Sequence, residues 1–170
     1  MKKYFLVTAC LVLAATVRLT SETTNEPVKS KDKTMNPPSV SLGYVTLYVK
    51  DVPASLTFYE KAFGLSRRFF NDDHGKAYGE LETGAARLSF ASLELAKSVL
   101  NREVVAAAPD TAPLGVEIAL VTSDVPALYA RAVNAGAVPI SEPAAKPWGQ
   151  TVAYLRDNTG HLVALCTPLP

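Results

Sequence analysis

The sequence is poor in the residues that build disulfide scaffolds and metal sites. Its 170 residues include only two cysteines and two histidines. This scarcity excludes a disulfide-stapled fold and argues against any histidine-rich or cysteine-rich metal centre. An excess of charge of one sign is also lacking, because the formal net charge is +1. Nothing in that balance attracts a phosphate backbone, so we expect no nucleic-acid partner.

What remains is an ordinary globular composition. Hydrophobic residues make up 48% of the chain and charged residues 19%. A disordered protein would have less apolar material and more charge. The length favours one folded domain.

The N-terminal segment has the pattern of a secretory signal peptide. Lys2 and Lys3 precede an uncharged run of 14 residues, 4–17, which Arg18 ends. A spanning helix needs about 20 apolar residues, so this run is short for an anchor. We expect a signal peptide over 1–20 and export to the periplasm or medium. An uncleaved anchor is one alternative, and lipidation of Cys10 in a lipoprotein-like box is another.

A polar stretch follows and then the folded region begins. Residues 21–41 show no apolar periodicity and contain two adjacent prolines, which is typical of a flexible linker. We expect the folded domain over 42–168.

That domain is an internal duplication. The tetrapeptide at 51–54, Asp-Val-Pro-Ala, recurs at 124–127, an offset of 73 residues. Each copy follows an apolar stretch typical of a strand and precedes a helical pattern that ends near Gly64 or Gly136. Asp51 and Asp124 are candidate N-caps.

Three strand patterns follow each helix. The first set is expected at 66–70, 76–81 and 86–91, and the second at 138–141, 150–155 and 161–167. The chain therefore has the order β-α-β-β-β twice, with module 1 at 42–91, a linker at 92–113 that begins with a short helix, and module 2 at 114–168. We predict an α+β fold in which two βαβββ modules form paired curved mixed sheets around a cleft.

This arrangement resembles the vicinal oxygen chelate superfamily, which includes glyoxalase I, extradiol dioxygenases and the fosfomycin- and bleomycin-resistance proteins. The similarity is carried by 44–51 with 56–59 and 63–65, and by Trp-Gly-Gln at 148–150 with 157–163. The resemblance implies a site between the two modules, and cups built within one chain or across a dimer.

Metal-dependent relatives hold an ion with one ligand from the first and last strand of each module. The matching positions here are Tyr44, Ser89, Glu117 and Ala164. Only Glu117 is an ordinary ligand for a divalent ion, and such a site needs three or more donors. The resemblance with these substitutions implies a cleft without metal or other cofactor.

Glu117 is the candidate reactive residue. It begins an apolar strand and is expected on the cleft face, where a carboxylate taken from water pairs or titrates abnormally. It could act as a general base or as a clamp for a cationic or amine-bearing ligand. The structural alternative is an ion pair, with Arg87 as the expected partner.

Other side chains are expected to line the cleft. Aromatic residues there would stack on a flat or cationic ligand, although core packing is the alternative for each. The predicted ligand-binding residues are Tyr44, Arg87, Ser89, Phe90, Trp148, Tyr154 and Ala164, with Tyr78 as a further candidate lining residue. His161, after a Thr-Gly turn, is expected at the surface, and Cys166 is expected to be an inert strand residue.

The sequence thus predicts an exported, metal-free protein that binds a small organic ligand and that assembles as a monomer or homodimer. The alternatives are a lyase or isomerase of the same superfamily that uses Glu117 as base, and a structural module with a filled cleft. Catalysis itself is not settled by the sequence.

Overall fold

The computed structural model describes residues 39–170, of which Val40–Pro170 form one compact unit. The expected signal peptide at 1–20, and the linker at 21–41 except its last three residues, lie outside the described residues. In residues 39–170, no helix has the length and apolar character needed to cross a membrane.

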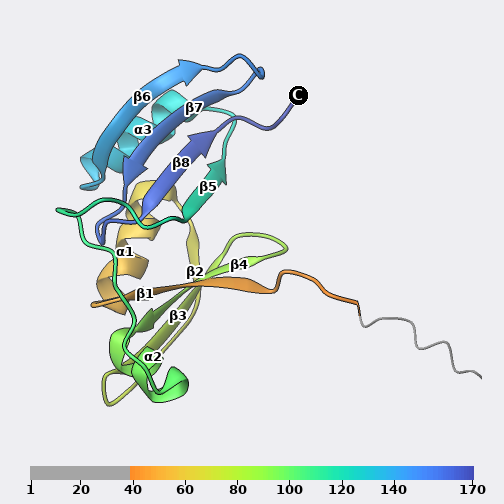
Figure 1. Cartoon of the computed structure of the whole chain (residues 1–170). Helices are drawn as coiled ribbons and strands as arrows, with labels where there is room; N and C mark the ends of the chain where they lie inside the picture. Colours follow the sequence, from red (N-terminus) through yellow and green to blue (C-terminus); the bar gives the residue numbers. More distant parts are fainter. Residues whose placement is uncertain (1–38) are drawn as a thin grey trace, which may run out of the picture. The chain divides into compact units, whose positions relative to one another are not determined.

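Two modules with the same order of elements follow one another (Figure 1). Module 1 contains β1 (Tyr44–Val49), α1 (Val52–Phe63), β2 (Ser66–Asp73), β3 (Lys76–Glu82) and β4 (Arg87–Ser92). The helix α2 (Leu93–Leu100) begins the connection to module 2. Module 2 contains β5 (Glu117–Val121), α3 (Val125–Asn134), β6 (Val138–Ala145), β7 (Thr151–Arg156) and β8 (Leu162–Cys166).

Each module forms a four-stranded mixed sheet. Sheet A has the order β1-β4-β3-β2 and sheet B the order β5-β8-β7-β6. The first and last strands of each module pair in parallel, and the other pairs are antiparallel. The predicted α+β class and the duplicated βαβββ order are confirmed. In the described residues β1 and β5 pair only within their own sheets, so the two sheets do not close into one.

The duplicated tetrapeptide starts both helices by the same capping geometry. The Asp51 carboxylate accepts a hydrogen bond from the Ala54 amide at 2.8 Å, and Asp124 accepts one from Ala127 at 3.0 Å. These bonds satisfy amides that have no partner inside the helix. Gly64 ends α1 at a φ of 72°, a left-handed conformation that glycine adopts without a steric cost.

In each module one helix, α1 or α3, covers one face of the sheet, and the core lies between that helix and the sheet. In module 1 the Tyr59 ring packs edge-on against Phe90, with centroids 5.0 Å apart. Gly79 in β3 lies so close to α1 that a Cβ there would be 2.6 Å from the Leu56 side chain. In module 2 Ala153, Leu155, Val163 and Leu165 of β7 and β8 belong to the same core. The side chains at alternate positions therefore lie on the opposite face of each sheet.

Helix α1 also packs against α3 and joins the modules (Figure 1). Arg131 of α3 donates from Nε to the Lys61 carbonyl at 2.7 Å and from Nη2 to the Glu60 carbonyl at 3.1 Å. These carbonyls belong to the last turn of α1, where a cation is favoured by the helix dipole.

Two strands are longer than the sequence predicted. The ladder between β2 and β3 continues through 71–73, which look like turn residues because they are polar. Strand β6 continues past Pro143 because register shifts between 139 and 141 and between 141 and 144 accommodate residues that cannot pair regularly.

Candidate functional site

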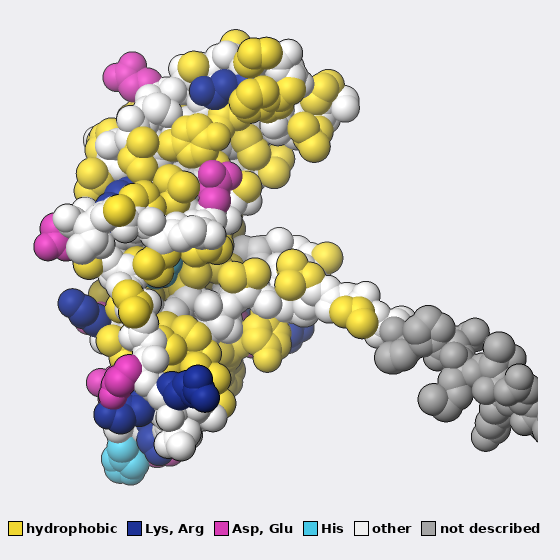
Figure 2. Space-filling view, in the orientation of Figure 1, with side chains coloured by type: hydrophobic (Ala, Val, Ile, Leu, Met, Phe, Trp, Pro, Cys, Tyr) yellow, Lys and Arg dark blue, Asp and Glu magenta, His cyan; other side chains and the backbone are white. Residues whose placement is uncertain are grey.

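Sheet B carries an apolar hollow on the face opposite α3. The hollow has a volume of about 470 Å³, within the usual size range of small-molecule pockets. Its lining consists of Glu117, Ala119, Val121, Trp148, Gln150, Val152, Tyr154, Ala164, Cys166 and Leu169. Figure 2 shows hydrophobic side chains gathered over this module. We call this space the sheet B hollow.

Strand alternation places these residues together. In β5 the odd-numbered positions from Glu117 to Val121 face the hollow, while Ile118 and Leu120 pack against the core. Tyr154 and Ala164 are direct cross-strand partners in the β7–β8 ladder. Ala164 therefore leaves space where a larger residue would fill the floor of the hollow.

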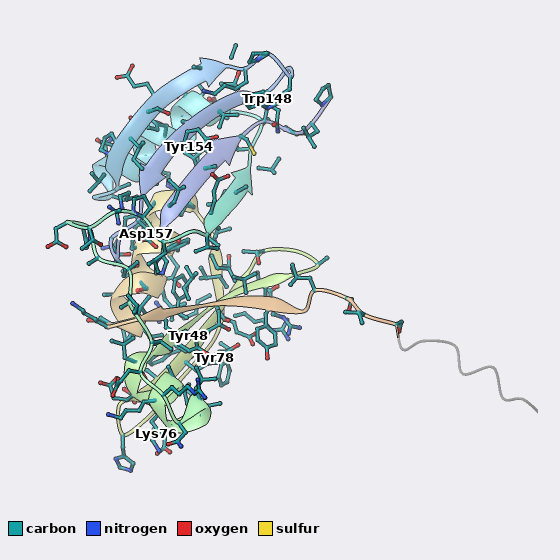
Figure 3. The ribbon with its side chains drawn as sticks, in the orientation of Figure 1. Tyr48, Lys76, Tyr78, Trp148, Tyr154 and Asp157 are labelled. Carbon is teal, nitrogen blue, oxygen red and sulfur yellow. The ribbon has the colours of Figure 1, made fainter. Side chains whose placement is uncertain are left out.

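Trp148 and Tyr154 supply the aromatic rings of the hollow (Figure 3). The Trp148 side chain is 54% exposed, and its Nε1 donates to Gln150 Oε1 at 2.9 Å. The Gln150 amide donates in turn to the Thr167 carbonyl at 2.5 Å, which links the tryptophan to the C-terminal segment. The Lys146 ammonium lies 5.9 Å from the centroid of the Tyr154 ring, so that ring already has a cation near it.

Glu117 is the single charged residue lining the hollow among the residues that the structure describes. It is exposed, and within residues 39–170 its carboxylate forms no ion pair. The predicted burial of this group and its predicted pairing with Arg87 are both wrong. Arg87 lies instead beside Glu80, with Nε 3.7 Å from Oε2.

The corresponding face of sheet A is polar. Glu80 is its centre, since the Tyr78 hydroxyl donates to its Oε1 at 3.0 Å and Arg68 Nε lies 3.4 Å from its Oε2. Ser89 is fully buried, donates to the Val45 carbonyl at 3.1 Å and lies 2.7 Å from the Thr46 hydroxyl. Arg87 and Ser89 share this face, as period-two alternation predicts.

Partial burial raises the pKa of the Tyr78 hydroxyl above its ordinary value. The nearby Ser89 hydroxyl opposes this shift, whereas the hydrogen bond to Glu80 and the charge of that carboxylate add to it. The Tyr78 hydroxyl therefore stays protonated at neutral pH and acts as a hydrogen-bond donor on this face.

The structure separates the predicted ligand-binding residues into three groups. Trp148, Tyr154 and Ala164 lie in the sheet B hollow with Glu117. Tyr44, Arg87 and Ser89 belong to sheet A, where Tyr44 is 59% exposed at the start of β1. Phe90 lies neither in the sheet B hollow nor on the polar face of sheet A, because it is fully buried in the core against Tyr59 of α1.

The sequence of the chain matches a known protein family. A family model described as the Glyoxalase/Bleomycin resistance protein/Dioxygenase superfamily matches residues 41–165. The chain belongs to this superfamily. No curated protein matches it.

Solved structures of similar proteins share the fold of this superfamily. A glyoxalase-related enzyme from Fulvimarina pelagi is 21% identical, with a TM-score of 0.65 over 75% of this chain and 88% of that one. A glyoxalase/bleomycin resistance protein/dioxygenase from Nocardioides is 20% identical, with a TM-score of 0.62 over 79% and 87%. A family enzyme from Burkholderia phytofirmans PsJN is 20% identical, with a TM-score of 0.59 over 75% and 98%.

The residues at the metal-ligand positions of the superfamily do not fit a divalent ion. Ala164 has no donor atom, and the Ser89 hydroxyl is held by the Val45 carbonyl and Thr46. Tyr44 offers a phenol, which leaves Glu117 as the one carboxylate in a set where three or more strong donors are needed. Nowhere in residues 39–170 do three His, Cys, Asp or Glu side chains converge.

A buried polar cluster at the turn before β8 was not predicted. Asp157 is fully buried and accepts from the Tyr59 hydroxyl at 3.0 Å and from the His161 amide at 2.8 Å. The Thr159 amide and hydroxyl also donate to it, at 2.9 and 2.8 Å. The expected surface position of His161 is wrong, since its side chain is 4% exposed and its Nδ1 lies 3.3 Å from Asp157.

Several lining residues of the hollow were also missed. Val121, Val152 and Cys166 face it alongside the predicted residues. Strand alternation from Glu117 and Ala164 would have found Val121 and Cys166, because both lie two or four residues further along the same strands. Leu169 could not be found this way, since it follows the last strand.

Proposed function

We propose that this protein binds a small organic ligand in the sheet B hollow without the help of a metal ion. The ligand has an apolar or aromatic body and a cationic group. The observation that carries the proposal is the chemistry of the lining: apolar side chains, the exposed Trp148 ring and the half-buried Tyr154 ring surround one carboxylate that forms no ion pair within residues 39–170. Such a lining favours an apolar body by burial and a cation by charge.

The donor set at the superfamily's ligand positions supports the metal-free part of the proposal, because Tyr44, Ser89 and Ala164 cannot replace the missing carboxylates or imidazoles. The alternative in which Glu117 is a general base gains less support. Glu117 is exposed, and neither His74 nor His161 lines the hollow. The alternative of a filled cleft is opposed by the volume of about 470 Å³.

The chain's single tryptophan makes the proposal measurable, since Trp148 lies in the hollow. Phenethylamine, 2-phenylethanol and 3-phenylpropionate carry a cationic, neutral and anionic group on one aromatic body. We expect phenethylamine to change Trp148 fluorescence at the lowest concentration. Glu117→Gln should weaken phenethylamine binding about fivefold, the usual limit for an exposed ion pair, and should leave 2-phenylethanol unchanged.

Glu94→Gln is the matched control, because Glu94 is an exposed carboxylate on α2 outside the hollow. It should leave all three affinities unchanged. Equal affinities of the wild-type protein for all three compounds, or no fluorescence response to any of them, would contradict the proposed ligand class.

Export and a homodimer remain predictions. The N-terminal residue of the secreted or periplasmic protein, read by mass spectrometry, tests the signal peptide. In the described residues the outer edges of β1, β2, β5 and β6 are unpaired, so a second copy has strand edges to which it could pair. Sedimentation velocity of the mature protein tests this, and a monomer at all concentrations would exclude the dimer.

A further inference from the structure

A second cavity lies between the two modules and shares Glu117, Ala119 and Val121 with the sheet B hollow. Its volume is about 480 Å³. Val45 and Leu88 contribute apolar wall from sheet A, and Ile118 and Leu120 contribute it from β5. We call this space the inter-module pocket.

Two opposite charges face this pocket from different modules. Arg87, the first residue of β4, and Glu117, the first residue of β5, are its only charged lining residues in the part of the chain that the structure describes. They do not form an ion pair with each other. The pocket therefore holds a positive and a negative group apart, with apolar surface around them.

The Arg87 guanidinium has unused donors. Its contact with a carboxylate is through Nε, 3.7 Å from Glu80 Oε2, which is too long for a hydrogen bond. Glu80 is shared with Arg68 and with the Tyr78 hydroxyl, so its charge is only partly available to Arg87. The Arg87 side chain is 39% exposed, and within residues 39–170 its Nη atoms make no hydrogen bond. A planar fork with free Nη atoms is suited to a carboxylate.

We propose that the inter-module pocket recognises a zwitterionic ligand with an apolar body, such as an apolar amino acid or short apolar peptide. Glu117 binds the ammonium group and Arg87 binds the carboxylate. This inference rests on the proposed function, because Glu117 borders both the hollow and the pocket. It adds a second charged group to the ligand and assigns that group to module 1.

The test is calorimetric titration with leucine, Leu-Leu and Leu-Leu-Leu, which carry the two charges at increasing separation. Each is compared with its C-terminal amide, which keeps only the cation, and with its N-acetyl form, which keeps only the anion. We expect one zwitterion of the series to bind about tenfold more tightly than its own amide, the usual gain from a charge-assisted hydrogen bond. Arg87→Gln should remove that gain and leave the amide unchanged.

Arg102→Gln is the matched control, since Arg102 is an exposed arginine that neither contacts Glu80 nor lines the pocket. It should leave the gain intact. Equal binding of every zwitterion and its amide would overturn this inference while leaving the cationic site at Glu117 in place. Absence of binding by zwitterions and amides alike would overturn the proposed function as well.

A double-mutant cycle on stability without ligand excludes the competing explanation. If Arg87→Gln and Glu117→Gln change the free energy of unfolding additively, the two charges do not interact in the free protein, as the proposal requires. A clear coupling energy would mean that the two residues pair with each other, and would overturn the role of Arg87 in ligand binding.

Discussion

At the scale of single residues, Asp157 shows how a buried acid is kept ionised. Burial alone would raise the pKa of its carboxyl group, but the hydrogen bonds and charge of His161, together with Thr159, hold the pKa below its ordinary value. Burial and the neighbouring Asp157 charge raise the pKa of the Tyr59 hydroxyl well above its usual range. The phenol therefore remains the donor and the carboxylate the acceptor, across the junction of the two modules.

This arrangement predicts a pH-dependent contribution to stability. A lowered folded-state pKa contributes stability above the unfolded value of about 3.9, and the contribution is lost as pH falls through the folded-state pKa. Asp157→Asn should lower the free energy of unfolding by about 3 kcal/mol at pH 7, and this difference should shrink in acid. Urea unfolding between pH 7 and pH 2.5 measures it.

Asp110→Asn is the control, because Asp110 is exposed in the connection between the modules. It should have no effect at any of these pH values. A loss for Asp157→Asn that stayed constant from pH 7 to pH 2.5 would mean that the carboxylate charge is not what stabilises the cluster.

At the scale of elements, the turns before β4 and β8 each contain a glycine with a similar positive φ angle but with different surroundings. Gly84 and Gly160 have φ angles of 93° and 97°. A Cβ at Gly84 would meet nothing within 4 Å, whereas one at Gly160 would lie 2.5 Å from the Ala108 carbonyl carbon. The connection between the modules is thus pressed against the second turn, where Arg156 Nη2 donates to the Ala108 carbonyl at 2.7 Å.

The two glycines predict different losses of unfolding free energy for the same substitution to alanine. Gly84→Ala should cost about 1 to 2 kcal/mol of unfolding free energy, the strain of a left-handed conformation. Gly160→Ala carries the same strain and must also displace backbone, so it should cost at least about 2 kcal/mol more. Denaturant unfolding of both variants measures the difference. Equal losses would show that the connection moves away freely.

Most of the fold could be predicted at this scale, because the signals are local. The repeated Asp-Val-Pro-Ala caps, the glycine stop and the strand patterns each depend on neighbouring residues, and the structure confirms them. The position of Phe90 was also available, since the residue next to Ser89 must face the other side of the strand. The burial of His161 was not, because it depends on which distant segment covers the turn.

At the scale of the whole molecule, the two modules contribute different chemistry. Sheet A presents a polar face centred on Glu80, and sheet B presents an apolar hollow with one carboxylate. Sequence identified residues on both faces through the superfamily resemblance. It could not predict that Glu117 forms no ion pair within residues 39–170, because this depends on how the modules pack. The contact between Arg87 and Glu80 depends on the register of β3 and β4 within sheet A.

Metal-free binding is tested most directly by following Trp148 fluorescence during titration with phenethylamine after exhaustive dialysis against EDTA. The titration is then repeated with stoichiometric nickel, manganese or zinc. We predict the same dissociation constant with and without each ion, and no metal retained after desalting. A fluorescence response that appears only when one of the ions is present, together with one retained ion per chain, would contradict metal-free binding.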